Sequence, residues 1–223
     1  MAELDYLFVM TYGRSGSTLL QGVLGSIPGY LIRGENRQLM RHLHEFHRGA
    51  LHERRTQRRQ NVRRNRPGNQ TSTVHAFFGM DGFPRRTSVR RIRQLALDTL
   101  LRPEPDTRVV GFKEIRWEGD DLAEYVAWLR EVFPGARFVV NTRDLDDVSR
   151  SQWWAERPDG RGDLEQVERG ILEVADTLGK DAFRVHYDDW ATDPEALRPL
   201  FAWLGEPYDA ASVQAVLDRP HSY

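Results

Sequence analysis

The residues best suited to chemistry in this sequence form one short loop, Gly13-Arg14-Ser15-Gly16-Ser17-Thr18. An apolar run precedes this loop at residues 6–12, and apolar residues at helical spacing follow it until Pro28. A buried strand, a loop of small residues and a helix start form an anion-binding site. Backbone N–H groups converge there, and the helix N-terminus is partly positive. The sequence therefore predicts a loop that binds a phosphate-like group; the alternative is a tight turn that uses its glycines for geometry alone.

The loop differs from the nucleoside-triphosphate motif G-x-x-x-x-G-K-[ST]. Thr11 stands at the first glycine position and Ser17 stands where the motif lysine is required. A different cation, Arg14, occurs earlier in the loop. The residue that most directly binds a γ-phosphate is therefore missing, although the phosphate-binding geometry is retained.

Two further cations follow predicted strands. Lys113 comes after the strand at residues 108–112, and Arg143 comes after the strand at residues 137–142. In a parallel sheet, ligands bind beyond the carboxyl ends of the strands. We therefore expect Lys113, Arg143 and the loop to lie at one edge of a sheet.

The elements that must position these residues alternate between strands and helices along the chain. This alternation predicts an α/β fold of three layers, with a central, mostly parallel sheet covered by helices on both faces. A chain of 223 residues is long enough for a substantial core. We expect one domain over residues 1–223, with a basic insertion or lid at roughly residues 37–102.

The near-neutral net charge of −1 hides an uneven distribution. Residues 33–116 hold 20 Lys and Arg against 8 Asp and Glu, while the remainder holds 12 against 25. Such a basic block indicates an anionic partner or ligand, or else a solvated surface. The chain has no cysteine, which excludes disulfides, thiolate zinc sites and thiol nucleophiles. It shows no apolar run long enough to span a membrane and no signal-peptide pattern, so we expect a cytoplasmic protein.

Four histidines in the basic block raise the question of a metal site: His42, His44, His47 and His52. Their spacing does not fit the H-E-x-x-H pattern, and the many neighbouring arginines would disfavour a bound cation. We therefore expect no metal site.

The motifs together resemble the sulfotransferases that use 3′-phosphoadenosine 5′-phosphosulfate (PAPS). YGRSGSTLL resembles the family's 5′-phosphosulfate loop, and RFVVNTRDLDDVSRSQWW resembles its 3′-phosphate motif. In the latter motif the resemblance assigns the 3′-phosphate to Arg143 and Ser151. VHYDDWATDPEALRPLFAWLGEP resembles the segment that closes the nucleotide site, and it places Tyr187 near the adenine. The resemblance implies the P-loop-like sulfotransferase fold and extends over most of the chain, except for residues 37–102.

The resemblance also suggests catalytic roles. Arg14 would act on the leaving-group side, with Lys113 as a second cation. Glu35 matches the general base of many sulfotransferases that act on sugars, and Glu114 is the alternative base. The K-x-H form of the phenol- and steroid-modifying branch is absent. This absence favours a carbohydrate, a glycolipid or a small metabolite as acceptor.

The sequence thus predicts a sulfotransferase that moves a sulfuryl group from PAPS to a hydroxyl without a metal. A nucleotide-dependent kinase and a non-enzymatic polyanion-binding module are the alternatives. The arginine-rich segment could bind an anionic acceptor or contact a membrane surface, or it could be a solvated face. No groove-reading motif for nucleic acid is present.

Overall fold

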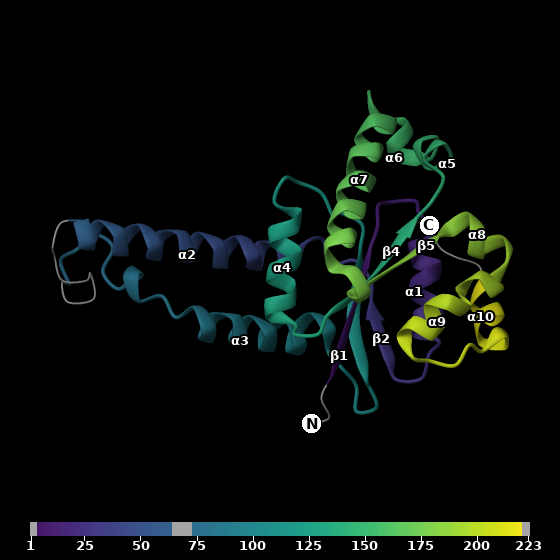
Figure 1. Ribbon diagram of the computed structural model, residues 1–223, viewed down its shortest axis with the longest axis horizontal. Helices are drawn as coiled ribbons and strands as arrows, with labels where there is room; N and C mark the ends of the chain where they lie inside the picture. The colour runs from purple at the N-terminus through teal and green to yellow at the C-terminus, as the bar shows by residue number, and fades with distance from the viewer. Residues whose placement is uncertain (1–3, 64–72, 220–223) are drawn as a thin grey trace.

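The computed structural model describes residues 4–63 and 73–219 (Figure 1). Five strands form one sheet in the order β2-β3-β1-β4-β5, and every neighbouring pair is parallel. The strands are β1 (Asp5–Met10), β2 (Tyr30–Arg33), β3 (Val109–Glu114), β4 (Arg137–Thr142) and β5 (Ala182–His186). The predicted parallel sheet is therefore confirmed.

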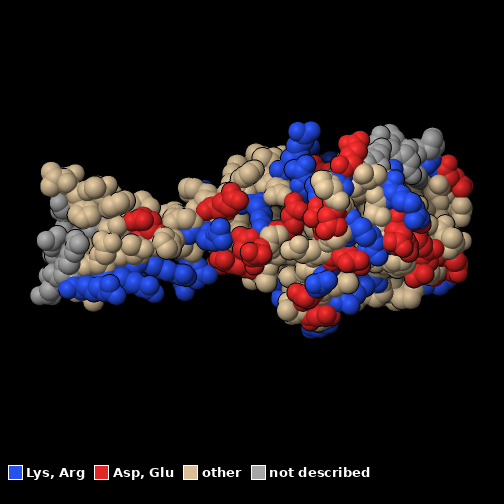
Figure 2. Space-filling model, turned by 90° about the horizontal axis from the view of Figure 1, so that it is seen from above, with Lys and Arg blue, Asp and Glu red and all other residues tan. Residues whose placement is uncertain are grey.

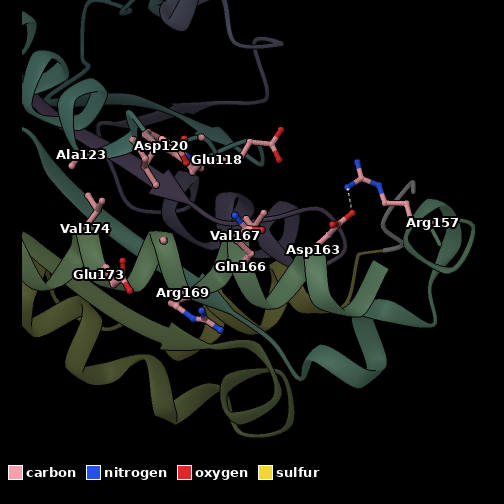
Figure 3. A pocket seen from close by; sticks show the side chains of 14 residues that line it. Glu118, Asp120, Ala123, Arg157, Asp163, Gln166, Val167, Arg169, Glu173 and Val174 are labelled. Carbon is pink, nitrogen blue, oxygen red and sulfur yellow. Dashed lines mark hydrogen bonds and ion pairs between the residues drawn. The ribbon is translucent and has the colours of Figure 1, made fainter. Parts of the chain in front are cut away.

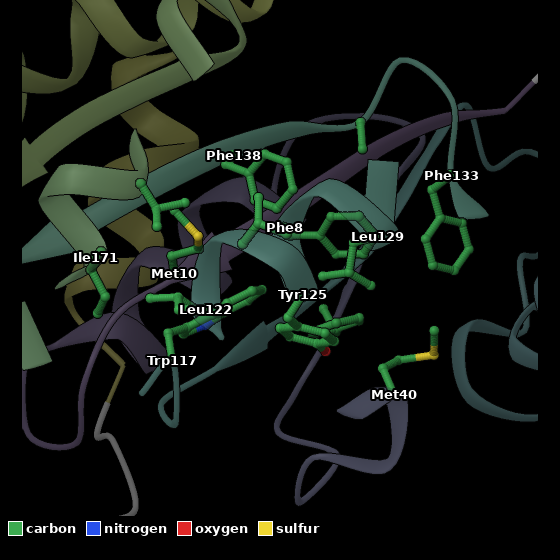
Figure 4. Close-up of a cluster of buried hydrophobic side chains, with 14 of the residues drawn as sticks. Phe8, Met10, Met40, Trp117, Leu122, Tyr125, Leu129, Phe133, Phe138 and Ile171 are labelled. Carbon is green, nitrogen blue, oxygen red and sulfur yellow. The ribbon is translucent and has the colours of Figure 1, made fainter. Parts of the chain in front are cut away.

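The apolar sequence of β1 explains its central position, because both faces of a central parallel strand are covered. Leu7 and Val9 pack into one buried cluster, and Phe8 and Met10 pack into another on the opposite face. Successive side chains of a strand point to opposite faces, so one strand supplies both cores. Figure 4 shows the second cluster, where Phe8 packs with Phe138.

Helices cover both faces of the sheet and complete the three predicted layers (Figure 1). One face is covered by α1, α9 and α10, and the other by α4 and α7. The helices of the body are α1 (Ser17–Gly25), α4 (Leu122–Val132), α5 (Leu145–Ser149), α6 (Gln152–Ala155), α7 (Gly160–Leu178), α8 (Tyr187–Thr192), α9 (Arg198–Leu204) and α10 (Ala210–Leu217).

An arm extends away from the body in Figure 1. It consists of α2 (Leu39–Arg63), residues 73–84 with the short helix η2 (Met80–Gly82), and α3 (Arg85–Ala96), which leads back through η3 (Leu97–Leu101) to β3. The arm occupies most of the predicted basic insertion; residues 64–72 lie outside the described part of the chain. The role of this segment as a lid stays a prediction.

The base of the arm is fixed to α4 by buried contacts. His44 packs against the rings of Tyr125 and Trp128, at centroid distances of 5.5 and 5.1 Å. The guanidinium of Arg41 pairs with Asp121 at the start of α4. These contacts join only the proximal part of α2 to the body.

Two expectations from the sequence are wrong in detail. The sequence predicts a helix that is capped by Asp144 and runs through Ser151 and Trp154, but the structure divides this segment into α5 and α6. Ser151 interrupts it with extended backbone (φ −99°, ψ 132°), and its hydroxyl donates to the Val148 carbonyl, a local bond that competes with the helix. Residues 67–86, rich in Gly, Asn, Ser, Thr and Phe, predict a loop, but η2 lies within this range and α3 begins at Arg85.

Candidate active site

The phosphate-type loop lies between the end of β1 and the start of α1, as predicted. Arg14 and Gly16 both have left-handed backbone, with φ of 71° and 77°. Such a conformation is unusual for arginine and occurs where the surroundings enforce it, often at functional sites. The loop is therefore rigidly shaped rather than a simple connection.

Buried polar groups on neighbouring elements hold the loop in this shape. Asn141 of β4 donates from Nδ2 to the Ser15 carbonyl at 2.7 Å, and Trp154 of α6 donates from Nε1 to the Gly13 carbonyl at 3.0 Å. Thr11 donates to the Asn141 carbonyl at 2.7 Å. Each bond is shielded from water, so losing it would leave a costly unsatisfied group. Two separate elements, β4 and α6, thus fix the loop.

Arg143 and Tyr187 converge on this loop from β4 and α8. An ideal Cβ added to Gly16 would lie 2.0 Å from Cδ2 of Tyr187, so the tyrosine ring packs directly on the loop backbone. The Arg143 guanidinium lies over that ring at 4.7 Å from its centroid. It also donates from Nη1 to the Arg14 carbonyl at 3.2 Å. The structure therefore brings together residues 13–18, Arg143 and Tyr187.

Arg143 retains an unsatisfied donor within this cluster. Its Nε atom is buried and has no hydrogen-bond partner among the described residues. The nearest acid, Asp188, lies 3.7 Å from it, beyond hydrogen-bond distance. A buried charged donor of this kind needs a partner, and an anionic ligand beside the loop would supply one.

Glu35, which follows β2, forms an ion pair with Lys113, which the structure places inside β3, near its end, and not after the strand. Lys113 Nζ lies 2.5 Å from Glu35 Oε1. The lysine side chain is 5% exposed, whereas the glutamate side chain is 40% exposed. A buried cation thus orients a carboxylate that is accessible to solvent. Glu35 and Lys113, two of the three predicted catalytic residues, are thus brought together by a contact that the sequence did not reveal.

The alternative base, Glu114, makes a different set of contacts. It is 5% exposed, and its carboxylate accepts backbone N–H bonds from Asn36 at 3.3 Å, Gln38 at 3.1 Å and Ile115 at 2.9 Å. The segment that it holds includes Arg37 and Gln38, both left-handed, with φ of 51° and 62°. Glu114 therefore shapes the turn after Glu35.

Ser151 is placed differently from the other predicted nucleotide-binding residues. It lies between α5 and α6, and its hydroxyl donates to the Val148 carbonyl at 2.7 Å. The Arg143 end of this segment is fixed by Asp144, whose carboxylate caps α5 by accepting from the N–H groups of Asp146 and Asp147. The hydroxyl would have to leave its local bond to donate to a ligand.

Sequence reasoning missed Tyr12, which connects the loop to Arg143. Its hydroxyl donates to Glu168 Oε2 at 2.5 Å and accepts from the Arg143 N–H at 2.8 Å. Burial, followed by the bond to Glu168, strongly raises the pKa of Tyr12, so the phenol stays neutral. Asn141 was also missed; a polar residue in the apolar run RFVVNT was the available signal.

Two histidines of the basic block, His44 and His47, are buried and make separate contacts. His44 is buried against aromatic rings, and His47 Nδ1 lies 3.1 Å from the Ser88 hydroxyl. Burial lowers the pKa of both His44 and His47. Among the described residues, no three His, Asp or Glu side chains are grouped so that they could hold a metal ion.

Two adjoining cavities open beside the site. One, of about 590 Å³, is lined by the basic residues Arg37, His42, Arg116 and Arg157 and by Trp154, which also bonds to the loop. The other, of about 660 Å³, lies between α4 and α7 and is shown in Figure 3. The two cavities share Glu118, Arg157 and Val167 in their walls. Residues 13–18 line neither cavity. Trp154, which bonds to the Gly13 carbonyl and lines the smaller cavity, connects the loop to this space.

Comparison with known proteins places this site in a family. The profile of the sulfotransferase family matches residues 6–210, and the chain belongs to this family. No curated protein sequence matches the chain. The structure is similar to the sulfotransferase domain of the Synechococcus PCC 7002 olefin synthase, with a TM-score of 0.57 and 19% identity over 95% of this chain and 78% of that one.

A second solved structure, the sulfotransferase domain from the curacin biosynthetic pathway, is also similar. Its TM-score is 0.56 and its identity is 15%, over 99% of this chain and 80% of that one. At such identities the similarity shows the fold alone, and it confirms the predicted P-loop-like α/β sulfotransferase fold.

Proposed function

We propose that this protein transfers a sulfuryl group from PAPS to a hydroxyl of an acceptor. One observation carries the proposal: Arg143 bonds to the loop backbone at Arg14 and keeps a buried, unsatisfied Nε donor. A nucleotide with anionic groups at both its 5′ and 3′ ends needs two neighbouring anion-binding sites. The loop would supply one of these sites and Arg143 the other. Membership of the sulfotransferase family supports the same reaction.

The nucleotide would be held by the residues around the loop. Backbone N–H groups of residues 13–18 and the N-terminus of α1 would hold the 5′-phosphosulfate. Arg143 would hold the 3′-phosphate, with Ser151 as a second donor. Tyr187, packed on Gly16 and beneath Arg143, would form a wall of the adenosine site. These contacts require no metal.

Catalysis would combine positioning with charge stabilisation. The acceptor hydroxyl oxygen attacks sulfur while the bond from sulfur to the bridging phosphate oxygen breaks, so the adenosine bisphosphate leaves with the electron pair. Glu35 takes the hydroxyl proton, and Lys113 orients its carboxylate through their ion pair. Arg14 would stabilise negative charge on the leaving group.

The acceptor would enter from the cavity beside Trp154. Four basic residues and a single acid line this cavity. No ion pair joins Arg37 or Arg116 to any described residue. A carbohydrate, glycolipid or small metabolite that carries a negative group would fit this lining, because the two free guanidiniums could bind it.

Thermal stabilisation by nucleotides tests the proposal. Adenosine 3′,5′-bisphosphate at 100 times its dissociation constant should raise the free energy of unfolding by about 2.7 kcal/mol, with or without Mg²⁺. AMP, which lacks the 3′-phosphate, should stabilise less. The Arg143→Gln variant should be stabilised equally by the two ligands. The control Arg184→Gln, at a residue of β5 that pairs with Asp176 of α7, should keep the difference.

Equal stabilisation by the bisphosphate and AMP would contradict the site. A larger effect of ATP, seen only with Mg²⁺, would favour a kinase instead. Labelled PAPS offered with a panel of sugars, glycolipids and hydroxy acids would then identify the acceptor.

A further inference from the structure

One side of α2 carries a row of arginines, and the distal members of this row have no acidic partner among the described residues. Arg48, Arg55, Arg59 and Arg63 of α2 follow one another at intervals of seven, four and four residues, which places them along one side of the helix. Arg48, at the base, pairs with Asp121 at 3.1 Å. No ion pair joins Arg55, Arg59 or Arg63 to a residue in the described part of the chain. Figure 2 shows basic side chains gathered along one edge of the arm.

The same part of the arm exposes large apolar side chains. Val62 and Val74 are 81% and 94% exposed, and Phe77 and Phe78 are 45% and 48% exposed. Large apolar side chains as exposed as these are unfavourable in water unless a partner covers them. The arm therefore combines two unsatisfied features, positive charge and apolar surface, at its distal end.

We propose that the distal arm docks on an anionic lipid surface. A bilayer offers both complements at once, because its headgroups pair with arginines and its interface accepts phenylalanine and valine side chains. Nucleic acid would match the charge but offers no apolar phase along its backbone. Outside residues 33–116 the chain carries 25 Asp and Glu against 12 Lys and Arg, an excess of 13 acidic residues. An anionic lipid surface would repel this acidic part of the protein, so the arm alone would make the contact.

Vesicle sedimentation tests this proposal without relying on sulfuryl transfer. The full-length protein should bind phosphatidylcholine vesicles that contain about 30 mol% phosphatidylglycerol and should not bind vesicles of phosphatidylcholine alone. Raising the salt to about 0.5 M should release the protein, because exposed charges are then screened.

Two arm variants separate charge from apolar contact. Replacing Arg55, Arg59 and Arg63 by Gln should lower the partition coefficient about a hundredfold, since each basic residue near an anionic surface contributes about fivefold. The double variant Phe77→Ser and Phe78→Ser should lower it about tenfold or more. Glutamine keeps helix propensity close to that of arginine, and circular dichroism would verify that both variants are folded.

A matched control carries the same change in net charge on the body: Gln in place of Arg169, Arg198 and Arg219. This control should bind anionic vesicles as the wild type does. Equal binding to neutral and anionic vesicles, no binding at all, or a control that weakens as much as the arm triple would overturn the proposal. A concentration-dependent dimer that the arm variants abolish would instead assign the arm to a second copy of the chain.

Discussion

The two glutamates near Lys113 illustrate how neighbouring carboxylates acquire different roles. Glu35 pairs with a buried ammonium and keeps one side open to solvent, whereas Glu114 is buried beneath three backbone N–H groups. A general base must be reachable by the hydroxyl whose proton it removes. The contacts therefore favour Glu35 as the base and give Glu114 the task of shaping the turn that carries it.

Substitution of each glutamate should separate these tasks. We expect Glu35→Gln to lower turnover about 10²-fold or more while adenosine bisphosphate still stabilises the protein fully, because the amide cannot accept the proton. Glu114→Gln should instead lower the free energy of unfolding by about 1–3 kcal/mol, since charge-assisted bonds to backbone donors are lost. Steady-state kinetics and urea unfolding would measure both effects.

The opposite pattern would reassign the base. A Glu35→Gln enzyme with normal turnover, together with a stable but inactive Glu114→Gln enzyme, would move the proton acceptor to Glu114.

At the scale of elements, the loop and α1 depend on close contact with α8. Gly16 has φ of 77° and lies against the Tyr187 ring, so both its backbone conformation and the lack of a side chain are required. The ring in turn supports the guanidinium of Arg143. Gly16 thus allows the Tyr187 ring to pack between the two predicted phosphate sites, the loop and Arg143.

The Gly16→Ala substitution tests this arrangement. A methyl group would displace Tyr187 and strain the backbone, so we expect a loss of unfolding free energy of about 1–3 kcal/mol and weaker bisphosphate binding. The matched control is Gly49→Ala in the interior of α2, where a Cβ meets nothing within 4 Å. That change should stabilise the protein by up to about 1 kcal/mol. Unchanged bisphosphate affinity in Gly16→Ala would show that the packing of Tyr187 on the loop is dispensable.

At the scale of the whole molecule, the junction between arm and body contains two histidines whose charge is disfavoured. Desolvation lowers the pKa of His44, which is packed between Tyr125 and Trp128, and likewise that of His47. In the unfolded chain both imidazoles would titrate near 6.5. Below that pH the unfolded chain binds protons that the folded chain excludes, so folded stability falls as the pH is lowered.

This linkage predicts a measurable pH dependence. The free energy of unfolding should decrease between about pH 6.5 and 5, and the decrease should be smaller in His44→Phe, because the ring packing is kept and the titrating group is removed. Urea titrations at a series of pH values would give the slopes; identical slopes in wild type and His44→Phe would refute the role of the junction.

The sequence by itself determined the order and type of the main elements and the residues of the loop. Continuous apolar runs such as β1 predicted buried parallel strands, and that topology alone placed Lys113 and Arg143 at the same edge as residues 13–18. Local patterns are sufficient for such inferences because strand burial, helix spacing and turn residues are each encoded within a few neighbouring positions.

Only the tertiary structure decided how the side chains pair across elements. The bond from Arg143 to the Arg14 carbonyl spans 129 positions, and the ion pair of Lys113 with Glu35 spans 78. The sequence could not identify the partner of Arg143 or of Lys113, because the predicted topology places several acids and carbonyls at the same edge of the sheet. The projecting arm is also decided by the tertiary structure. Helical spacing predicts that α2 has a basic side, but only the packing shows that the body covers no more than the base of the arm.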